Sequence, residues 1–365
     1  MGNLTVGFIG LGLIGGSIAK GFKSKHPDMK IMAYARRKST LQAAFDDKTI
    51  DVMLDGIDEN LKECDYIFLC TPVTLNEMYI SAIKPFLKEG GIITDVGSVK
   101  GNIHRGIEKL DLEASFIGGH PMAGSEKSGY ENANDHLMEN AYYVITPTSL
   151  SPQDKVDELT ELVQDIGAIP LVMDYQTHDY VVAGISHLPH IIAATLVNLV
   201  KDKDCDAQLM KQVAAGGFKD ITRIASSSPE MWQQICMENK DNLADILGDY
   251  IESLKAIKGE IEAASSTAVY DLFDESREYR NSLPDKSRGP IKKHYAIYCD
   301  IIDKAGAIAT IATILGVHQI SIKNIGIIHN REFEEGVLSI EFYDEKASLE
   351  AADLLKKFQY TVYIR

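Results

Sequence analysis

Short apolar runs alternate with amphipathic stretches along the first part of the chain. Runs of this kind span residues 4–10, 30–35, 65–71 and 91–96, and two more lie at 115–119 and 141–146. A helical pattern follows the first run and extends to about residue 24. Apolar strands separated by helices are typical of a parallel sheet that is covered on both faces. The pattern therefore predicts an α/β fold with a doubly wound, Rossmann-type sheet.

The strand pattern stops near residue 174, and residues 177–281 read as almost entirely helical. One stretch carries an apolar stripe at helical spacing. Its members are Leu243, Leu247, Tyr250, Leu254, Ile257 and Ile261. Long helices with such a stripe usually pack against each other or against a second subunit, so we expect a helical substrate and dimerisation domain and a homodimer.

A third unit follows a segment of linker composition that contains two prolines, a glycine and mixed charges. Beyond it the pattern predicts the order β-α-β-β-α-β, which is a ferredoxin-like plan. The predicted division is therefore 1–173 for the dinucleotide-binding domain, 174–282 for the helical domain, 283–293 for the linker and 294–365 for the last unit.

Composition and charge restrict the class of protein. The 365 residues are 45% hydrophobic and 25% charged, which suits a globular chain of two or three domains. A net charge of −16 argues against nucleic acid and anionic membranes as partners. The five scattered cysteines form no Cys-x-x-Cys pair, and we identify no leader or long apolar span, so a cytoplasmic protein is expected.

A glycine-rich loop joins the first predicted strand to the first helix. Gly10, Gly12 and Gly15 match G-x-G-x-x-G, with Leu13 and Ile14 between the last two glycines. The first glycine permits the tight turn, the second lets backbone approach a pyrophosphate, and the third lets helix and strand pack closely. The alternative is an ordinary glycine-rich turn, but the strand-to-helix context favours a dinucleotide site.

The end of the second predicted strand bears on which dinucleotide binds. NAD sites usually have an acidic residue there, whereas this chain has Ala35 followed by Arg36 and Arg37. Guanidinium groups match the oxygens of a 2′-phosphate, which favours NADP over NAD. The alternative is that both arginines are solvated charges beside an NAD site.

The segment from Gly118 to Gly124 (Gly-Gly-His-Pro-Met-Ala-Gly) places a histidine in a turn after a predicted strand. Such a histidine is a candidate acid or base, and the alternative is a structural histidine. Further motifs are Thr94 to Lys100, Ser125 to Gly129, Ile185 to His190, Gly216 to Ala225 and Pro229 to Trp232. In this order the segments resemble the prephenate/arogenate dehydrogenase family of tyrosine biosynthesis, over about residues 4–281.

The resemblance implies oxidative decarboxylation of prephenate to 4-hydroxyphenylpyruvate. Hydride leaves C4 for the nicotinamide of NAD or NADP, the hydroxyl proton leaves, and carbon dioxide is lost as the ring becomes aromatic. His120 matches the family's catalytic histidine, which accepts the C4 hydroxyl, and Ser98 matches a serine that contacts this hydroxyl or orients the histidine. Arg223 matches the arginine that binds a substrate carboxylate, although a salt bridge with Asp220 is an alternative.

Other positions take secondary roles. The resemblance places His190 near the substrate and leaves His187 to a structural role, with Pro189 starting or kinking the helix between them. Second-tier substrate candidates are Glu126, Lys219 and Trp232, and Thr71 and Pro72 are candidate cofactor contacts. We expect no metal, because the two histidines have no third ligand motif beside them.

The last unit resembles an ACT domain, an amino-acid-sensing module, and Asp303 to Gly306 fits its ligand turn. Feedback inhibition by tyrosine is therefore a hypothesis, and direct binding of tyrosine in the active site competes with it. Three alternative functions remain: an arogenate dehydrogenase, a β-hydroxyacid-type dehydrogenase, and a non-catalytic sensor of a dinucleotide and an amino acid. The β-hydroxyacid enzymes rely on a lysine in the helical domain, whereas the strongest signal here is the His120 segment. A non-catalytic sensor would not explain the presence of His120, Ser98 and Arg223.

Overall fold

The computed structural model describes residues 4–124, 127–283, 295–301, 306–328 and 336–364. Glu126, most of the predicted linker and the turn residues Asp303 to Ala305 lie outside these ranges. The chain divides into two compact units, Met1–Asp274 and Glu275–Arg365, which are described separately below.

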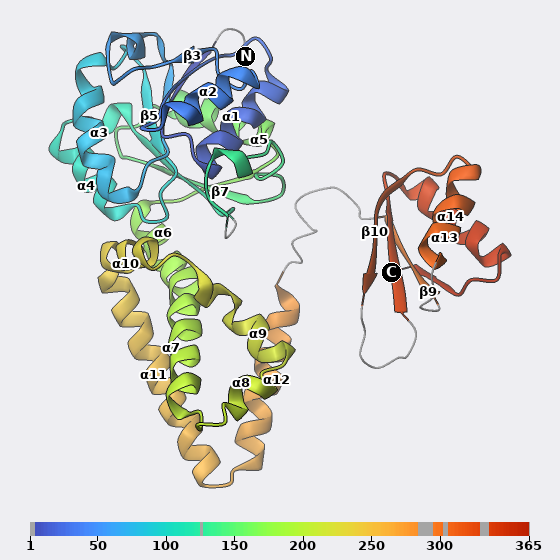
Figure 1. The fold of residues 1–365 in the computed structure, drawn as a ribbon. Coiled ribbons are helices and arrows are strands. Elements are labelled where there is room, and N and C mark those ends of the chain that lie inside the picture. The colour runs from blue at the N-terminus through green and yellow to red at the C-terminus, as the bar shows by residue number, and fades with distance from the viewer. Residues whose placement is uncertain (1–3, 125–126, 284–294, 302–305, 329–335, 365) are drawn as a thin grey trace. The chain divides into compact units, whose positions relative to one another are not determined.

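The first unit contains the predicted parallel sheet (Figure 1). Its strands are β1 (Thr5–Ile9), β2 (Lys30–Tyr34), β3 (Val52–Met53), β4 (Tyr66–Leu69) and β5 (Ile92–Asp95). They are ordered β3-β2-β1-β4-β5, and all neighbours pair in parallel. All carboxyl ends therefore meet at one edge, and the strand order reverses between β1 and β4. A crevice at such a reversal is where open α/β sheets bind their ligands.

Helices cover both faces of this sheet (Figure 1). They are α1 (Leu13–Lys25), α2 (Lys38–Asp46), α3 (Asn76–Ile83), α4 (Gly101–Lys109) and α5 (Gln153–Asp165). Successive strand residues point to opposite faces, so two cores form. On one face Phe8 and Phe68 stack with ring centroids 5.1 Å apart, beneath α1 and α5. On the other face Ile67 and Ile93 pack with α3 and α4.

Short 3₁₀ turns connect several of these elements. They span Glu59–Glu63, Val73–Leu75, Lys84–Phe86, Glu113–Ser115 and Tyr130–Asn132.

The strands after β5 do not simply extend the parallel sheet, which corrects the expectation of a wholly parallel arrangement. A second sheet contains β6 (Ile117–Pro121), β7 (Tyr142–Pro147) and β8 (Ile169–Val172). The β6–β7 pair is antiparallel and the β7–β8 pair is parallel. A single parallel bridge, Ile93 to Phe116, runs beside β5 just before β6 begins. It follows that β6 runs in the direction of β5 and ends at the same edge as the glycine-rich loop.

The remainder of the first unit is helical, as predicted. Its elements are α6 (Tyr175–Val182), a π-helical segment (Ala183–His187), α7 (Leu188–Lys203), α8 (Leu209–Val213), α9 (Gly216–Thr222), a 3₁₀ turn (Arg223–Ser226), α10 (Pro229–Glu238) and α11 (Lys240–Glu262). α12 (Ser266–Ser282) spans the boundary between the two units. Figure 1 shows α7 and α11 as two long helices, and they contact each other.

Pro189 lies in the first turn of α7, just after the π segment, where a proline that starts or kinks a helix is expected. Helical structure continues from Tyr175 to Lys203, and the π segment lies one turn before the proline. A proline has no N–H for the carbonyl four residues earlier, so a widened turn accommodates it without ending the helix. By length and composition alone, this run of 29 residues is long and apolar enough to cross a membrane, which is weak evidence because long helices of folded domains meet the same criterion.

The second unit has the predicted β-α-β-β-α-β order. Its elements are β9 (Tyr295–Ile301), α13 (Ala307–Val317), β10 (Ile322–Ile328), β11 (Gly336–Phe342), α14 (Glu345–Lys357) and β12 (Val362–Ile364). The antiparallel sheet has the order β10-β11-β9-β12. Its core joins Ile297, Leu338 and Ile340 of the strands to Leu315 and Leu355 of the two helices.

Candidate active site

The glycine-rich loop has the geometry that a dinucleotide requires. Gly10 has φ 95°, and a Cβ there would lie 2.6 Å from the Cys70 carbonyl oxygen. A Cβ on Gly15 would lie 2.7 Å from the Gly10 carbonyl oxygen, whereas a Cβ on Gly12 would meet nothing within 4 Å. Close packing therefore demands Gly10 and Gly15, while Gly12 faces open space where a pyrophosphate would approach.

Helix α1 begins directly behind this loop. Gly12 is its N-cap, and no side chain of the described chain caps it. The N–H groups of the first turn, including those of Leu13 and Ile14, thus have no partner within the helix. Unpartnered N–H groups and the positive end of the helix dipole together suit phosphate. The loop consequently fits the group that the sequence predicts.

The end of β2 presents its cations to solvent. Ala35 is half-buried, and Arg36 and Arg37 are exposed. The neighbouring Lys38 is paired with Asp55 at 3.3 Å, and both of these side chains are almost fully exposed. The structure thus places both arginines at the carboxyl edge of the sheet, beside the glycine-rich loop, because Gly10 N–H donates to the Tyr34 carbonyl at 2.8 Å.

Three further predicted positions lie at the same edge. Thr71 and Pro72 follow β4, and the Thr71 hydroxyl donates to Asn76 Oδ1 at 3.3 Å. Ser98 is half-buried in the loop between β5 and α4. Since β1, β4 and β5 are parallel neighbours, these positions lie around the point at which the strand order reverses.

His120 lies on β6 at this edge and is buried. The strand is held there by an ion pair between Lys100 and Asp95, both with fully buried side chains. The Lys100 ammonium also donates to the Gly119 carbonyl at 2.7 Å, and Asp95 accepts from the Gly119 N–H at 3.2 Å. The residue before His120 is thus fixed through both of its backbone polar groups.

The His120 ring contacts a second histidine from the helical part of the unit. Its Nδ1 lies 2.8 Å from Nε2 of His178, and Nδ1 of His178 lies 2.8 Å from Oδ1 of Asp179. Burial lowers the pKa of His120 well below 6.5, and electrostatic interactions with His178, Lys100 and His187 lower it further. His120 is therefore neutral at physiological pH and can accept a proton.

A second group of rings lies farther along the helical part. The His190 ring stacks on Trp232 with centroids 3.6 Å apart, and the His187 ring meets the same indole edge-on at 6.0 Å. Burial lowers the pKa of His190, the Arg223 charge lowers it further, and a hydrogen bond with the Ile224 backbone opposes both. The structure thus brings His190, Trp232 and Arg223 together.

His187 has a defined tautomer, although the sequence suggested only a structural role. Asn239 Nδ2 donates to the Asp179 carbonyl at 2.7 Å and lies 3.2 Å from Nδ1 of His187. Nδ1 is therefore an acceptor, and the proton of the neutral ring is on Nε2. Burial lowers the pKa of His187 to about 4. Nε2 of His187 and Nε1 of Trp232 are both buried donors without a partner among the described residues.

Lys219 and Arg223 lie one helical turn apart near the end of α9. Both side chains are exposed, and Arg223 begins the 3₁₀ turn that contacts α7. Because Glu126 lies outside the described residues, its predicted place in the pocket stays a prediction.

Four residues of the site were not singled out as functional from the sequence: His178, Asp179, Asn239 and the ion-paired Lys100. Three of their contacts join segments far apart in the sequence: His120–His178 by 58 residues, Asp179–Asn239 by 60 and Lys100–Asp179 by 79. The one local signal is the His178–Asp179 dipeptide, which combines an imidazole with a carboxylate.

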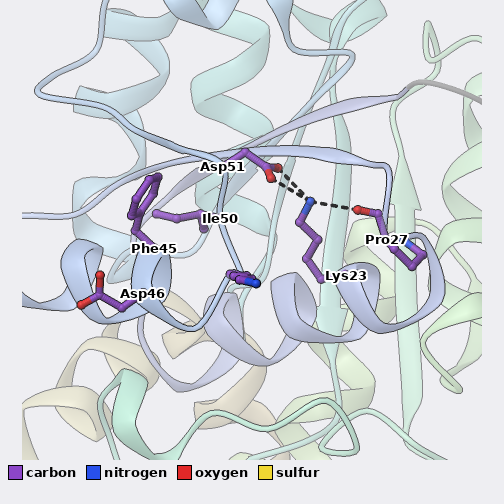
Figure 2. A pocket seen from close by; sticks show the side chains of 7 residues that line it. Lys23, Pro27, Phe45, Asp46, Ile50 and Asp51 are labelled. Atoms are coloured by element: carbon purple, nitrogen blue, oxygen red, sulfur yellow. Dashed lines mark hydrogen bonds and ion pairs between the residues drawn. The ribbon is translucent and has the colours of Figure 1, made fainter.

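A pocket of about 750 Å³ lies elsewhere on the first unit, lined by Lys23, Pro27, Phe45, Asp46, Lys48, Ile50 and Asp51 (Figure 2). The Lys23 ammonium there donates to Asp51 at 2.9 Å and to the Pro27 carbonyl at 3.2 Å. Asp51 also accepts from the N–H of Ile31, near the start of β2. This pocket is therefore at the amino edge of the sheet, opposite the glycine-rich loop, and we do not assign it to the site.

Within the described ranges, no group of three or more histidine, cysteine, aspartate or glutamate side chains is arranged to hold a metal ion.

Comparison with known proteins identifies both parts of the first unit. Residues 18–171 match the family model described as prephenate dehydrogenase, nucleotide-binding domain. Residues 174–275 match the model described as prephenate dehydrogenase, dimerization domain.

Individual prephenate dehydrogenases are similar to this chain over most of its length. A prephenate dehydrogenase of Bacillus subtilis is 38% identical over 347 residues, which cover 93% of this chain and 92% of the relative. A prephenate dehydrogenase of Lactococcus lactis is 35% identical over 353 residues, and the match covers 96% of this chain and 96% of the relative. A solved prephenate dehydrogenase from A. aeolicus, in complex with hydroxyphenyl propionate and NAD+, has a TM-score of 0.73 and 31% identity; the match covers 78% of this chain and 99% of that one.

Proposed function

The chain belongs to the prephenate dehydrogenase family, and we propose that it converts prephenate to 4-hydroxyphenylpyruvate by oxidative decarboxylation. The single observation that carries the chemistry is the buried, neutral His120 at the sheet edge that also carries the glycine-rich loop. That arrangement suits a dehydrogenase because a proton acceptor and a dinucleotide site must lie at one substrate.

His120 handles the proton of the C4 hydroxyl. Its Nε2 accepts the hydrogen bond of that hydroxyl and takes the proton as hydride leaves C4. The bond from the ring to its carboxylate then breaks, carbon dioxide departs, and the same nitrogen returns the proton to the oxygen as the ring becomes aromatic. Bound nicotinamide dinucleotide supplies the hydride acceptor. Ser98, in the loop that follows β5, orients the hydroxyl and the histidine.

The substrate's two carboxylates and its keto group need donors and cations. Arg223 binds one carboxylate, because a guanidinium can form a bidentate pair with it. His190 and Lys219 add donors or charge near it, and Glu126 orients the pocket. The orphan N–H groups of His187 and Trp232 support this proposal, because buried donors without a partner are costly unless a ligand accepts from them.

For the cofactor, we propose that Gly10, Gly12, Leu13, Ile14 and Gly15 hold the pyrophosphate, with Thr71 and Pro72 beside the ribose. Arg36 and Arg37 are proposed to bind a 2′-phosphate, so that NADP is preferred over NAD. The exposed position of both arginines beside the glycine-rich loop supports this preference. Replacing Arg36 with alanine should then raise KM for NADP more than KM for NAD.

We also propose a homodimer built on the helical part. The description of the matched model supports it, as does the apolar stripe of α11, in which Leu254 and Ile261 are exposed in the single chain. Size-exclusion chromatography with light scattering tests this proposal. We retain the division into 1–173, 174–282, 283–293 and 294–365, and a cytoplasmic location, as part of the same proposal.

The C-terminal unit is proposed to be an ACT-like regulatory domain that binds tyrosine. Its β-α-β-β-α-β order with an antiparallel sheet supports this assignment. Removal of residues 290–365 should abolish inhibition by tyrosine. Unchanged inhibition would instead favour tyrosine binding in the active site.

Reduced-cofactor absorbance tests the activity. Four reactions cross prephenate or arogenate with NAD or NADP, and each is repeated with His120→Asn. We expect turnover of prephenate that falls by orders of magnitude in the variant. Turnover of arogenate alone would make the chain an arogenate dehydrogenase, and cofactor binding without any turnover would favour a sensor.

A further inference from the structure

We propose that His178 and Asp179 are positioning residues that hold the His120 ring with its proton on Nδ1 and its lone pair on Nε2. The inference rests on the proposed function, because it concerns the group that accepts the substrate proton. It adds two residues from α6 to a site whose base lies on β6.

The three side chains form a continuous buried chain. His120 Nδ1 and His178 Nε2 are 2.8 Å apart, and the two rings meet at 73° with centroids 5.0 Å apart. His178 Nδ1 and Asp179 Oδ1 are also 2.8 Å apart. All three side chains are buried, so bulk water does not compete for these hydrogen bonds.

We take His178 as the neutral ring, and the Asp179 carboxylate then sets the direction of each bond in this chain. An ionised carboxylate only accepts, so His178 Nδ1 carries a proton and donates to Asp179. The Nε2 of a neutral His178 is then an acceptor, and His120 Nδ1 must carry the proton between the two rings. A neutral His120 has one ring proton, so its Nε2 is left with a lone pair for the substrate hydroxyl.

Asp179 itself is held in place by the nucleotide domain. Oδ1 accepts from the Lys100 N–H at 2.8 Å, and Oδ2 accepts from the Gly101 N–H at 2.7 Å. These donors are at the start of α4, where N–H groups have no partner in the helix and the dipole favours a negative charge. One carboxylate therefore ties α6 to the segment that follows Ser98 and also fixes the tautomer of His120.

Among the described residues, His178 is the hydrogen-bond partner of His120 Nδ1. Lys100 and His187 influence His120 electrostatically and lower its pKa. Asp95 is occupied by Lys100 and by the N–H groups of Gly97 and Gly119. Loss of His178 would therefore leave Nδ1 unpaired, and the ring could take the other tautomer, which has no lone pair toward the substrate.

Steady-state kinetics of four full-chain variants test the proposal. Asp179→Asn and His178→Leu should lower kcat on the order of 10²- to 10⁴-fold with little change in KM, because they affect the base and not substrate binding. His178→Gln should retain more kcat than His178→Leu, since a carboxamide oxygen can accept from Nδ1. Asp174→Asn is the matched control, because Asp174 caps the same helix but is exposed, and it should retain the wild-type values.

Nitrogen-15 NMR of the histidine rings gives a second measurement, with the His120 signals assigned through His120→Asn. In the wild-type chain we expect an unprotonated Nε2 and a protonated Nδ1, and in His178→Leu a protonated Nε2. A protonated Nε2 in the wild type, or folded Asp179→Asn and His178→Leu variants with wild-type kcat, would overturn the proposal. Absence of turnover in the wild type would instead count against the proposed function, while the NMR result would still decide the tautomer.

Discussion

Replacement of Lys100 by methionine tests the anchor behind His120. The Lys100 ammonium is fully buried, and it donates to Asp95 and to the Gly119 carbonyl. Methionine has a similar volume but no donor, so the Asp95 carboxylate keeps only the N–H groups of Gly97 and Gly119. Removing one partner of a buried ion pair costs about 3–5 kcal/mol, because a buried charge is left uncompensated.

This cost sets the expected change in melting temperature. A domain of this size loses about 2–4 °C of Tm for each kcal/mol, so Lys100→Met should lower Tm by roughly 6–20 °C. Adding Asp95→Asn should recover part of the loss, since the double variant has no unpaired buried charge. The assay is thermal unfolding followed by circular dichroism at one protein concentration.

Lys255→Met is the matched control. Lys255 pairs with Glu252 at 2.8 Å on the surface of α11, and exposed pairs contribute less than about 1 kcal/mol. The reasoning is refuted if Lys100→Met lowers Tm no more than Lys255→Met does. It is also refuted if Asp95→Asn lowers the Tm of Lys100→Met still further.

Three further predictions concern the cofactor loop and the histidines. Gly15→Ala should weaken NAD(P) binding in calorimetry, because its Cβ would lie 2.7 Å from the Gly10 carbonyl, whereas Gly56→Ala, with open space around it, should not. Since the pKa of His120 is well below 6.5, kcat/KM for prephenate should stay level as pH falls through 6.5; an acid limb at that pH would contradict this expectation. The pKa of buried His104 is about 3 and that of buried His187 is about 4, both below the pKa of a histidine in the unfolded chain. As pH falls, these histidines therefore bind protons in the unfolded chain before they do so in the folded chain. Each should therefore remove about 2 kcal/mol of stability between pH 8 and 5, which a series of Tm measurements would show and a flat series would refute.

Much of the first unit could be predicted because its pattern is local. The strands of the parallel sheet are buried on both faces, so each reads as an apolar run whatever it pairs with. β3 and β8 were not predicted, because neither gives a clear strand pattern in the sequence. β3 has two residues, and β8 is a partly exposed edge strand with Pro170 inside it. The direction of β7 was also beyond prediction, because antiparallel pairing with β6 is decided by tertiary contacts.

The residues of the candidate site also fall into those that local sequence predicts and those that depend on tertiary contacts. His120 and the glycine-rich loop were found because a tight turn requires particular residues in sequence. His178 and Asp179 were not found, since they lie within an ordinary helix and their role depends on a contact between His178 and a strand residue 58 positions earlier. His187 was assigned a structural role because sequence spacing gives no information about which ring nitrogen is already paired.

Local charges and hydrogen-bond donors at the site decide whether this acidic chain can bind a substrate with two negative charges. The overall charge of −16 repels such a ligand, so local charges must compensate. Both buried carboxylates beside His120 accept hydrogen bonds: Asp95 from Lys100 and two N–H groups, and Asp179 from His178 and two N–H groups. Two buried donors in the helical part, the N–H groups of His187 and Trp232, have no hydrogen-bond partner among the described residues. The oxidised nicotinamide ring carries a positive charge. Because the pKa of His120 is lowered, this histidine is neutral and does not repel that ring.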